Sequence, residues 1–452
     1  MRARRGARDV ATTVLARVAE EGAYASLALD AEISSARLEP RDAALATEIV
    51  YGTLRVLPAL DAVVAKHVAR ADRAIEPLAR AALRAGTYQI LHLSRVPPYA
   101  AVDETVSIVR EARGPKLAGF VNAVLRKIAG ERPDEPEPPR ALVVPDWLAA
   151  RLADSLGPER AEIFLAARPP PPPLGLRVTL ERASPDEVAR AIEEARPEAD
   201  VRRGTLSPRA LLVRGAGDPR SLPGYREGLF TVQEEGSQLV ALLAGATAGE
   251  RILDACAGRG GKTTLFAALV ASAGEGKVVA VDLYEDKLAR ISGEAQRLGL
   301  DASRIETHAI DLTVGSGGIA ERSFDRVVVD APCTGAGTIH RRPEIALRLT
   351  PDAPARMAEL QSAIVTRAAR WVRPGGVLVY AVCSPFHEEG IAVIERVERA
   401  TPSLVRVREG FSGLPEPTLD ADAVMRIGPW IGANDVDSYQ IVRWRDGSSG
   451  RP

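Results

Sequence analysis

From about residue 236 onward, short apolar stretches alternate with stretches that have the spacing of amphipathic helices. The apolar runs predict strands over 251–255, 277–283, 304–310, 324–331, 376–383 and 439–444. Continuous apolar strands are buried on both faces, and the helices between them can supply the cover on each face. The rhythm therefore predicts an α/β domain over 236–452 with a doubly wound, parallel sheet.

The chain before this domain begins with a region that reads as helical throughout. In residues 1–135, apolar side chains such as Leu45, Ile49 and Leu54 recur at helical spacing, and strand signals are absent. A polar, proline-rich stretch from 130 to 140 cannot bury a core. We therefore predict a separate all-α domain that ends there.

A smaller region, 141–235, lies between the two. Its apolar runs predict strands over 174–180 and 209–215 and helices over 147–167 and 184–195. A run of five prolines from 169 to 173 stops the first helix. Ser184 followed by Glu187 is the pattern of a capping box at the start of the second helix. This region is predicted to be an α+β module.

Composition restricts the class of protein. Of the 452 residues, 46% are hydrophobic and 26% are charged, with a formal net charge of −1. No apolar run approaches the ~20 residues of a membrane span, so we expect a cytoplasmic protein that does not bind membranes. The few histidines are scattered and the cysteines lack metal-site spacing, so no metal is expected. Nucleic acid could bind only through local basic patches such as His340, Arg341 and Arg342.

Every cysteine of the chain falls at a predicted strand end or in the turn that follows one. The three are Cys256, Cys333 and Cys383. Loops beyond the carboxyl ends of parallel strands are where open α/β sheets bind ligands. A reduced thiol in such a loop is a candidate nucleophile rather than half of a disulfide.

The segment DACAGRGGKTT (254–264) follows the first predicted strand and opens a helix, which predicts a ligand-binding turn. Its glycine spacing fits neither a P-loop nor the dinucleotide fingerprint. Asp282 ends the next strand, where it could accept hydrogen bonds from ribose hydroxyls, and Asp311 ends the third, where it suits an adenine amino group. This pattern favours S-adenosylmethionine, with a predicted binding loop made of Cys256, Ala257, Gly258, Arg259, Gly260, Gly261 and Lys262.

The segment DAPCTGAG (330–337) predicts covalent chemistry on a pyrimidine. The C5 atom of cytosine is not nucleophilic, but thiolate addition at C6 makes it enamine-like, so that it can accept a methyl group. Asp330, three residues before Cys333, could hydrogen-bond to the base during this addition. Local sequence alone favours Cys333 as the nucleophile. Cys383 is the second candidate, because the Ser-Pro after it ends a strand at the same sheet edge.

At these residues the chain resembles the bacterial Sun/Fmu (RsmB-like) family of 16S rRNA cytosine-5 methyltransferases. The resemblance extends to RDAALATEIVYGTLR (41–55), GFVNAVLRK (119–127) and YREGLFTVQEEGSQLV (225–240). It implies a NusB-like, RNA-binding helical domain, the α+β module, and a Rossmann-like methyltransferase domain that uses S-adenosylmethionine.

The resemblance also implies a role for each site residue. Cys383 corresponds to the family's nucleophile and Cys333 to the cysteine that assists product release, which reverses the preference from local sequence. Asp330 corresponds to a contact with the cofactor or the target base. Three positions depart from the family pattern: Gly258 and Arg259 replace alanine-proline, Val382 replaces threonine, and Asp437, Ser438 and Tyr439 replace aspartate-glycine-phenylalanine.

The sequence leaves two alternatives open. A tRNA cytosine-5 methyltransferase would use the same chemistry on a cytosine flipped from an RNA loop. A NusB-like RNA-binding factor with a vestigial methylase domain is the alternative from another class, although the intact Asp330, Cys333 and Cys383 count against it. The preferred hypothesis is a monomeric 16S rRNA methyltransferase that forms 5-methylcytosine.

Overall fold

The structure is a computed structural model that describes residues 5–68, 74–137, 139, 141–166, 172–271, 276–409, 419–431 and 435–448. It comprises two compact units. One unit holds residues 1–150, 165–169 and 339–349, and the other holds 151–164, 170–338 and 350–452. This division differs from the three predicted regions in two ways: most of the region 141–235 shares a unit with the α/β region, and residues 339–349 belong with the N-terminal helices.

The first unit is helical, as predicted. Its main helices are α1 (Ala7–Glu20), α2 (Ala25–Ala36), α3 (Pro40–Arg55), α4 (Leu57–His67), α5 (Pro77–His92), α6 (Pro98–Arg113) and α7 (Pro115–Ala129). Ile49 and Leu54, picked out by their spacing, are buried in one core of this unit. In the described part of the chain no single helix is long and apolar enough to cross a membrane. Among the described helices, only α3 and α4 taken together, which are bent against each other, have the length and apolar composition of a span.

The unit also contains α14 (Glu344–Arg348), from the segment that follows the Cys333 loop. Glu344 is buried, and its carboxylate accepts a hydrogen bond from the backbone N–H of Ala25 at the start of α2. The backbone carbonyl of His340 accepts a hydrogen bond from Arg55. The predicted basic patch around His340 therefore lies in a segment that is packed against helices, and not in a free loop.

The α+β module has a four-stranded sheet of order β2-β3-β1-β4. Its strands are β1 (Leu174–Val178), β2 (Asp200–Arg203), β3 (Ala210–Arg214) and β4 (Phe230–Val232), and all pairings are antiparallel. The capping box is confirmed at the start of α10 (Pro185–Ala195). The single helix predicted over 147–167 is wrong: α8 (Asp146–Leu156) and α9 (Pro158–Leu165) are separated by Gly157, whose φ of +79° breaks the helix. Most of the proline run lies outside the described residues.

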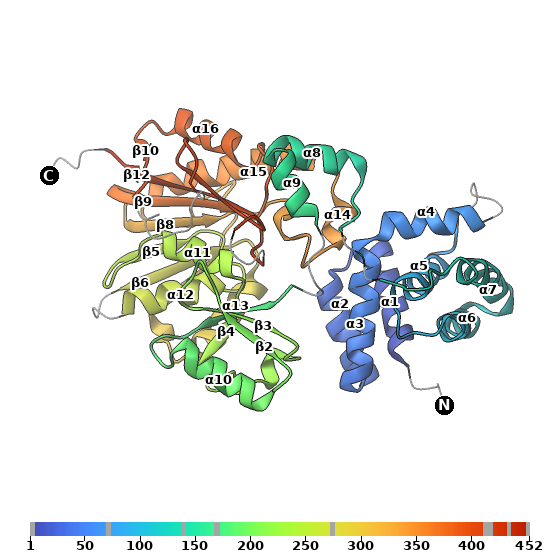
Figure 1. Cartoon of the computed structure of the whole chain (residues 1–452). Coiled ribbons are helices and arrows are strands. Elements are labelled where there is room, and N and C mark those ends of the chain that lie inside the picture. Colours follow the sequence, from blue (N-terminus) through green and yellow to red (C-terminus); the bar gives the residue numbers. More distant parts are fainter. Residues whose placement is uncertain are drawn as a thin grey trace. The chain divides into compact units, whose positions relative to one another are not determined.

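The large sheet has the order β10-β12-β9-β8-β5-β6-β7, with β11 paired to β12. Figure 1 labels the strands from β10 to β6 in this order. Its strands are β5 (Arg251–Asp254), β6 (Lys277–Asp282), β7 (Ile305–Ala309), β8 (Phe324–Asp330), β9 (Val372–Val382), β10 (Leu404–Arg406), β11 (Val424–Ile427) and β12 (Tyr439–Asp446). The six predicted strands are present. The five from β5 to β9 are parallel, so their carboxyl ends lie at one edge.

The prediction of an all-parallel sheet is wrong for the last strand, because β12 runs antiparallel to β9. A parallel neighbour requires a crossover, which α16 (Ile391–Ala400) supplies between β9 and β10. No described helix lies between β10 and β12, so the chain returns beside β9 in the opposite direction. The strands β10 and β11 hold only 3 and 4 residues, which is too short to have been recognised as strands in the sequence.

Helices cover both faces of this sheet, which confirms the doubly wound prediction (Figure 1). One face packs against α15 (Ala353–Ala368) and α16, with Trp371, Tyr380 and Trp444 buried in that layer. The other face packs against α11 (Glu235–Leu243) and α12 (Gly261–Val270), and α13 (Glu285–Arg297) covers Ala280 of the same face. Burial on both faces makes the sheet a rigid support for side chains at its edge.

Candidate active site

The predicted site residues gather where the parallel strands of the large sheet end. Asp254, Asp282 and Asp330 are the last residues of β5, β6 and β8, and Cys383 directly follows β9. These strands are adjacent and parallel, so strands far apart in sequence bring their terminal residues to one edge. The sequence placed this edge correctly because each strand ends in a polar or thiol residue.

The glycine-rich turn between β5 and α12 has the backbone shape of a ligand-binding loop. Gly258 and Gly260 have φ of +56° and +82°, which side chains rarely adopt. A Cβ on Gly260 would lie 2.7 Å from Ile291 of α13, whereas a Cβ on Gly258 would meet nothing within 4 Å. The turn is therefore packed on its inner side and open at Gly258, while Arg259 beside it is exposed.

Asp282 is joined to this turn. Its carboxylate accepts hydrogen bonds from the N–H of Gly258 at 2.8 Å and of Tyr284 at 3.0 Å. Leu283 and Tyr284, next to it, are more than half exposed and offer an apolar surface to a flat ligand. Asp311 lies two residues beyond β7, where Thr313 donates two hydrogen bonds to it and lowers its pKa. No hydrogen bond between Asp311 and the turn occurs in the described residues.

Asp254 is a site residue that sequence reasoning missed. It is fully buried, its Oδ2 accepts a hydrogen bond from Thr263 at 2.7 Å, and its Oδ1 has no partner in the described structure. Burial raises the pKa of this carboxyl to about 6. The signal was available, because Asp254 ends its strand as Asp282 and Asp330 end theirs. An orphaned buried acceptor beside an open glycine turn fits a ligand with a cationic amino group.

We expect Asp254→Asn to stabilise the ligand-free protein at high pH. The folded-state pKa of about 6 exceeds the ordinary value of 3.8, so ionising this group destabilises the fold as pH rises from about 4 through 6. A shift of this size corresponds to about 3 kcal/mol, which the neutral amide would restore at pH 8 but not at pH 4. Thermal unfolding at pH 4 and at pH 8 measures this difference, with Asp103→Asn, at an exposed position, as the control. An equal effect at both pH values would contradict the assignment.

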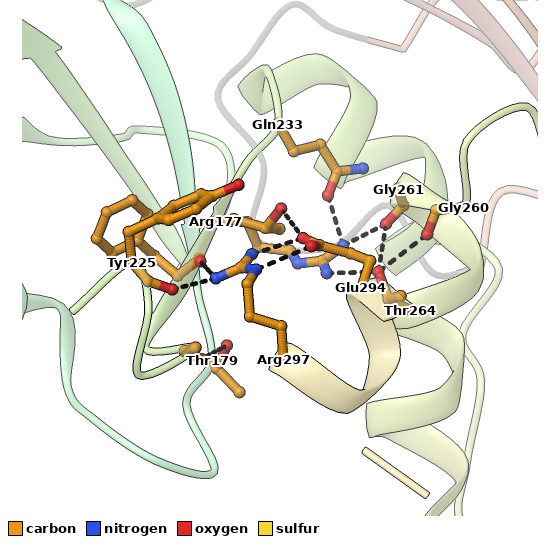
Figure 2. Close-up of polar contacts among 12 residues, drawn as sticks. Arg177, Thr179, Tyr225, Gln233, Gly260, Gly261, Thr264, Glu294 and Arg297 are labelled. Atoms are coloured by element: carbon orange, nitrogen blue, oxygen red, sulfur yellow. Dashed lines mark hydrogen bonds and ion pairs between the residues drawn. The ribbon is translucent and has the colours of Figure 1, made fainter. Parts of the chain in front are cut away.

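The α+β module holds the start of α12 in place (Figure 2). Arg177 of β1 is buried and donates hydrogen bonds to the carbonyl of Gly261, to Thr264 and to Gln233. Burial lowers the pKa of this guanidinium to about 9. Beside it, Arg297 of α13 donates to backbone carbonyls of the module. The module therefore contacts the glycine-rich turn from behind and fixes its orientation.

The two cysteines of the prediction meet at this edge. The Sγ atoms of Cys333 and Cys383 are 3.3 Å apart. The hydrogen bond between the thiols, together with burial, raises the pKa of Cys333 well above its usual value. Gly337 donates its N–H to the carbonyl of Cys383 at 2.9 Å, and a Cβ there would lie 2.1 Å from the carbonyl oxygen of Ser438. The two cysteine loops are thus held in close backbone contact.

Lys262 joins the glycine-rich turn to Asp330. Its ammonium is nearly buried, forms an ion pair with the Asp330 carboxylate and donates to Ser237 at 2.9 Å. The paired carboxylates raise the pKa of Lys262 despite burial, so the lysine stays charged. Lys262, predicted to bind the cofactor, therefore also contacts the predicted catalytic residue Asp330. Asp330 keeps a partly exposed carboxylate beside the cysteines, where it could contact a base.

The third cysteine has a different environment. Cys256 lies in the glycine-rich turn, where burial and nearby carboxylates raise the pKa of its thiol far above the ordinary value. It packs against the core under β5 and is not reactive as a thiolate. No cluster of potential metal ligands occurs among the described residues.

Comparison with known protein families finds two matching regions in the chain. Residues 5–130 match the NusB family, and residues 241–437 match the 16S rRNA methyltransferase RsmB/F family. The second match contains the glycine-rich turn, both catalytic cysteine candidates, the three strand-end acids and Asp311.

Individual relatives align over most of the chain. The Mycobacterium tuberculosis protein Rv1407 is 38% identical over 88% of the chain and 87% of its own length. The ribosomal RNA small subunit methyltransferase B of Pseudomonas putida is 34% identical over 87% and 89%. The solved structure of PH0851 superposes with a TM-score of 0.80 and 25% identity, covering 97% of this chain and 98% of that one. The chain belongs to the RsmB/F family of 16S rRNA methyltransferases and is a methyltransferase with a NusB-like N-terminal domain.

Proposed function

We propose that this methyltransferase forms 5-methylcytosine in 16S rRNA, with S-adenosylmethionine as the methyl donor and a covalent bond between Cys383 and the target base. The observation that supports it most is the pair of thiols 3.3 Å apart beside Asp330. A methyltransferase acting on a nucleophilic nitrogen or oxygen would need no cysteine at all, and two suit a reaction that makes and then breaks a thioether.

Cys383 acts as the nucleophile in this proposal. Its thiolate adds to C6 of the cytosine, which places electron density on C5 and lets that carbon form a bond to the methyl group. S-adenosylmethionine, when bound, supplies that methyl from its sulfonium. A base then removes the proton from C5, the electron pair re-forms the C5–C6 double bond, and the thiolate of Cys383 leaves. Cys333, whose raised pKa keeps it a thiol, lies beside the leaving sulfur and can donate a hydrogen bond to it.

Asp330 and Lys262 would activate the base. Addition at C6 raises negative charge on the ring, and a proton held between a carboxylate and N3 stabilises that charge. The Lys262 ammonium fixes the Asp330 carboxylate in place. The pair thus orients the target cytosine against Cys383, while the NusB-like domain would bind the surrounding RNA.

The cofactor would occupy the open turn at Gly258. The orphaned Asp254 oxygen suits an amino group, and Asp282 suits the ribose hydroxyls. We expect Asp282→Ala to weaken S-adenosylmethionine binding by ~10- to 100-fold, because it removes charge-assisted hydrogen bonds. Calorimetry measures this, and Asp301→Asn serves as the exposed control. Unchanged affinity would remove Asp282 from the cofactor site.

The substrate is tested by mapping 5-methylcytosine in total RNA from a deletion strain. The proposal expects one or more 16S rRNA cytosines to lose methylation, with restoration by the wild-type chain and not by Cys383→Ala. If methylation were lost only from tRNA, the substrate would be tRNA and not 16S rRNA. Methylation unchanged in every RNA would favour a binding factor with an inactive methylase domain.

A further inference from the structure

A buried carboxylate lies behind the two thiols, and the reaction scheme above does not use it. Glu389 follows Cys383 by six residues, in the turn between β9 and α16, and its side chain has no solvent exposure. No ion pair of Glu389 occurs among the described residues. A buried carboxylate without a cation is costly unless hydrogen bonds satisfy its oxygens.

Both oxygens of Glu389 are satisfied by the two cysteine loops. Its Oε2 accepts hydrogen bonds from the hydroxyls of Thr334 and Ser384, each at 2.5 Å. Its Oε1 accepts the backbone N–H of Thr334 at 2.8 Å. Thr334 and Ser384 are the residues directly after Cys333 and Cys383. One side chain therefore links the backbone turn after each thiol.

A second layer of buried polar groups fixes Glu389 itself. The amide of Gln361, on α15, donates to Glu389 Oε1 at 2.9 Å and to the carbonyl of Pro332 at 3.0 Å. The hydroxyl of Tyr380 lies 2.5 Å from the backbone carbonyl of Glu389. Gln440 of β12 donates to the carbonyls of Ser384 and Phe386. Both Glu389 oxygens and the Gln361 amide are satisfied in this network, whereas the side-chain oxygen of Gln440 has no hydrogen-bond partner among the described residues. Buried hydrogen bonds of this kind restrict the geometry of the groups that they join.

We propose that Glu389 is a positioning residue that ties the Cys333 loop to the Cys383 loop and so sets the separation of the two thiols. The inference builds on the proposed roles of the cysteines in RNA methylation. Glu389 does not touch the reacting atoms. It acts through Thr334 and Ser384, because rotation of either turn would carry its thiol away from the other.

Cross-linking of the thiols tests the geometry without any RNA. Diamide, which takes up two electrons and two protons from a pair of thiols, should convert the 3.3 Å contact into a disulfide rapidly in the wild-type protein. In Glu389→Ala we expect this rate to fall ~10-fold or more, and kcat to fall ~10- to 100-fold, since misplacement by about 1 Å can cost that much. S-adenosylmethionine affinity should stay within about twofold, because Glu389 does not contact the glycine-rich turn.

Glu389→Gln separates geometry from charge. The glutamine oxygen can accept from Thr334 N–H and Gln361, while its amide can donate to the two hydroxyls, whose hydrogens rotate. Cross-linking and kcat should therefore stay within about threefold of wild type. This variant also keeps the volume of the buried side chain, so it remains informative if the alanine variant unfolds. Glu388→Gln, one residue away and paired with Arg151, is the matched control and should behave as wild type.

Wild-type cross-linking in Glu389→Ala would overturn the proposal, as would a glutamine variant that folds but loses cross-linking as severely as alanine. Peptide mapping must assign the disulfide to Cys333 and Cys383, because Cys256 is the third thiol. An absence of RNA methylation in the wild type would instead refute the proposed function, and it would leave the cross-linking comparison intact.

Discussion

Replacing Cys383 with alanine should abolish methylation, because the proposed mechanism assigns the bond to C6 to this thiolate. Addition of a thiolate is what makes C5 reactive, so its loss should lower kcat below detection and remove any covalent protein–RNA complex. The variant should still fold, since Cys383 is only partly buried. Methyl transfer to target RNA and a denaturing gel measure the two effects.

Cys333→Ala should have the opposite effect on the covalent complex. If Cys333 helps the thiolate of Cys383 to leave, its loss stalls the reaction after methyl transfer, and protein stays attached to RNA as a slow-migrating band. The structure supports this pairing, since the two sulfur atoms are in contact. A complex that forms in Cys383→Ala and disappears in Cys333→Ala would exchange the two roles. If neither variant formed a covalent protein–RNA complex, the proposed role of Cys333 in releasing the product would be unsupported.

Asp330→Asn should cause the second-largest loss, ~100- to 1000-fold in kcat, because a positioned proton-transfer group contributes about that much. The amide can neither hold nor release the proton that the base requires. S-adenosylmethionine affinity should change by less than about threefold if Asp330 acts on the base. A large loss of affinity with kcat retained would instead place Asp330 in the cofactor site.

This substitution leaves the buried Lys262 ammonium without its carboxylate, and such unpaired charges destabilise proteins. Activity must therefore be compared per folded protein. Asp330→Asn combined with Lys262→Met removes both charges and should recover thermal stability without recovering kcat. Recovery of kcat in the double variant would show that the single variant failed through misfolding alone.

The strand ends were predictable because one physical rule covers them. Apolar runs in the sequence show which residues form the parallel strands. The polar residue that ends each run must then lie at the edge of the sheet formed by the carboxyl ends of the strands, where ligands bind. Asp282, Asp330 and Cys383 were located in this way. The capping box at Ser184 was predictable for a similar reason, since both of its hydrogen bonds are local.

Features that depend on contacts distant in sequence were not predictable. The close packing of the Gly337 backbone against Cys383 and Ser438 is one such feature. Nothing local to Glu389 indicates that it binds Thr334, 55 residues earlier. The antiparallel direction of β12 likewise could not be predicted. It depends on the absence of a described crossover helix between β10 and β12, and the spacing of apolar residues does not tell which way a strand runs. At Gly258 the structure explains a departure from the family pattern that the sequence had shown. The residue has a φ of +56°, a conformation that glycine adopts freely.

The roles of the two cysteines rest finally on which sulfur bonds to the base. Target RNA containing 5-fluorocytidine would trap the covalent complex, because fluorine at C5 cannot leave as a proton does. Digestion of the wild-type complex and mass spectrometry would then identify the peptide that carries the nucleotide. We predict that the modified peptide contains Cys383, with the methyl group on the trapped base. A nucleotide on the peptide containing Cys333 would contradict it.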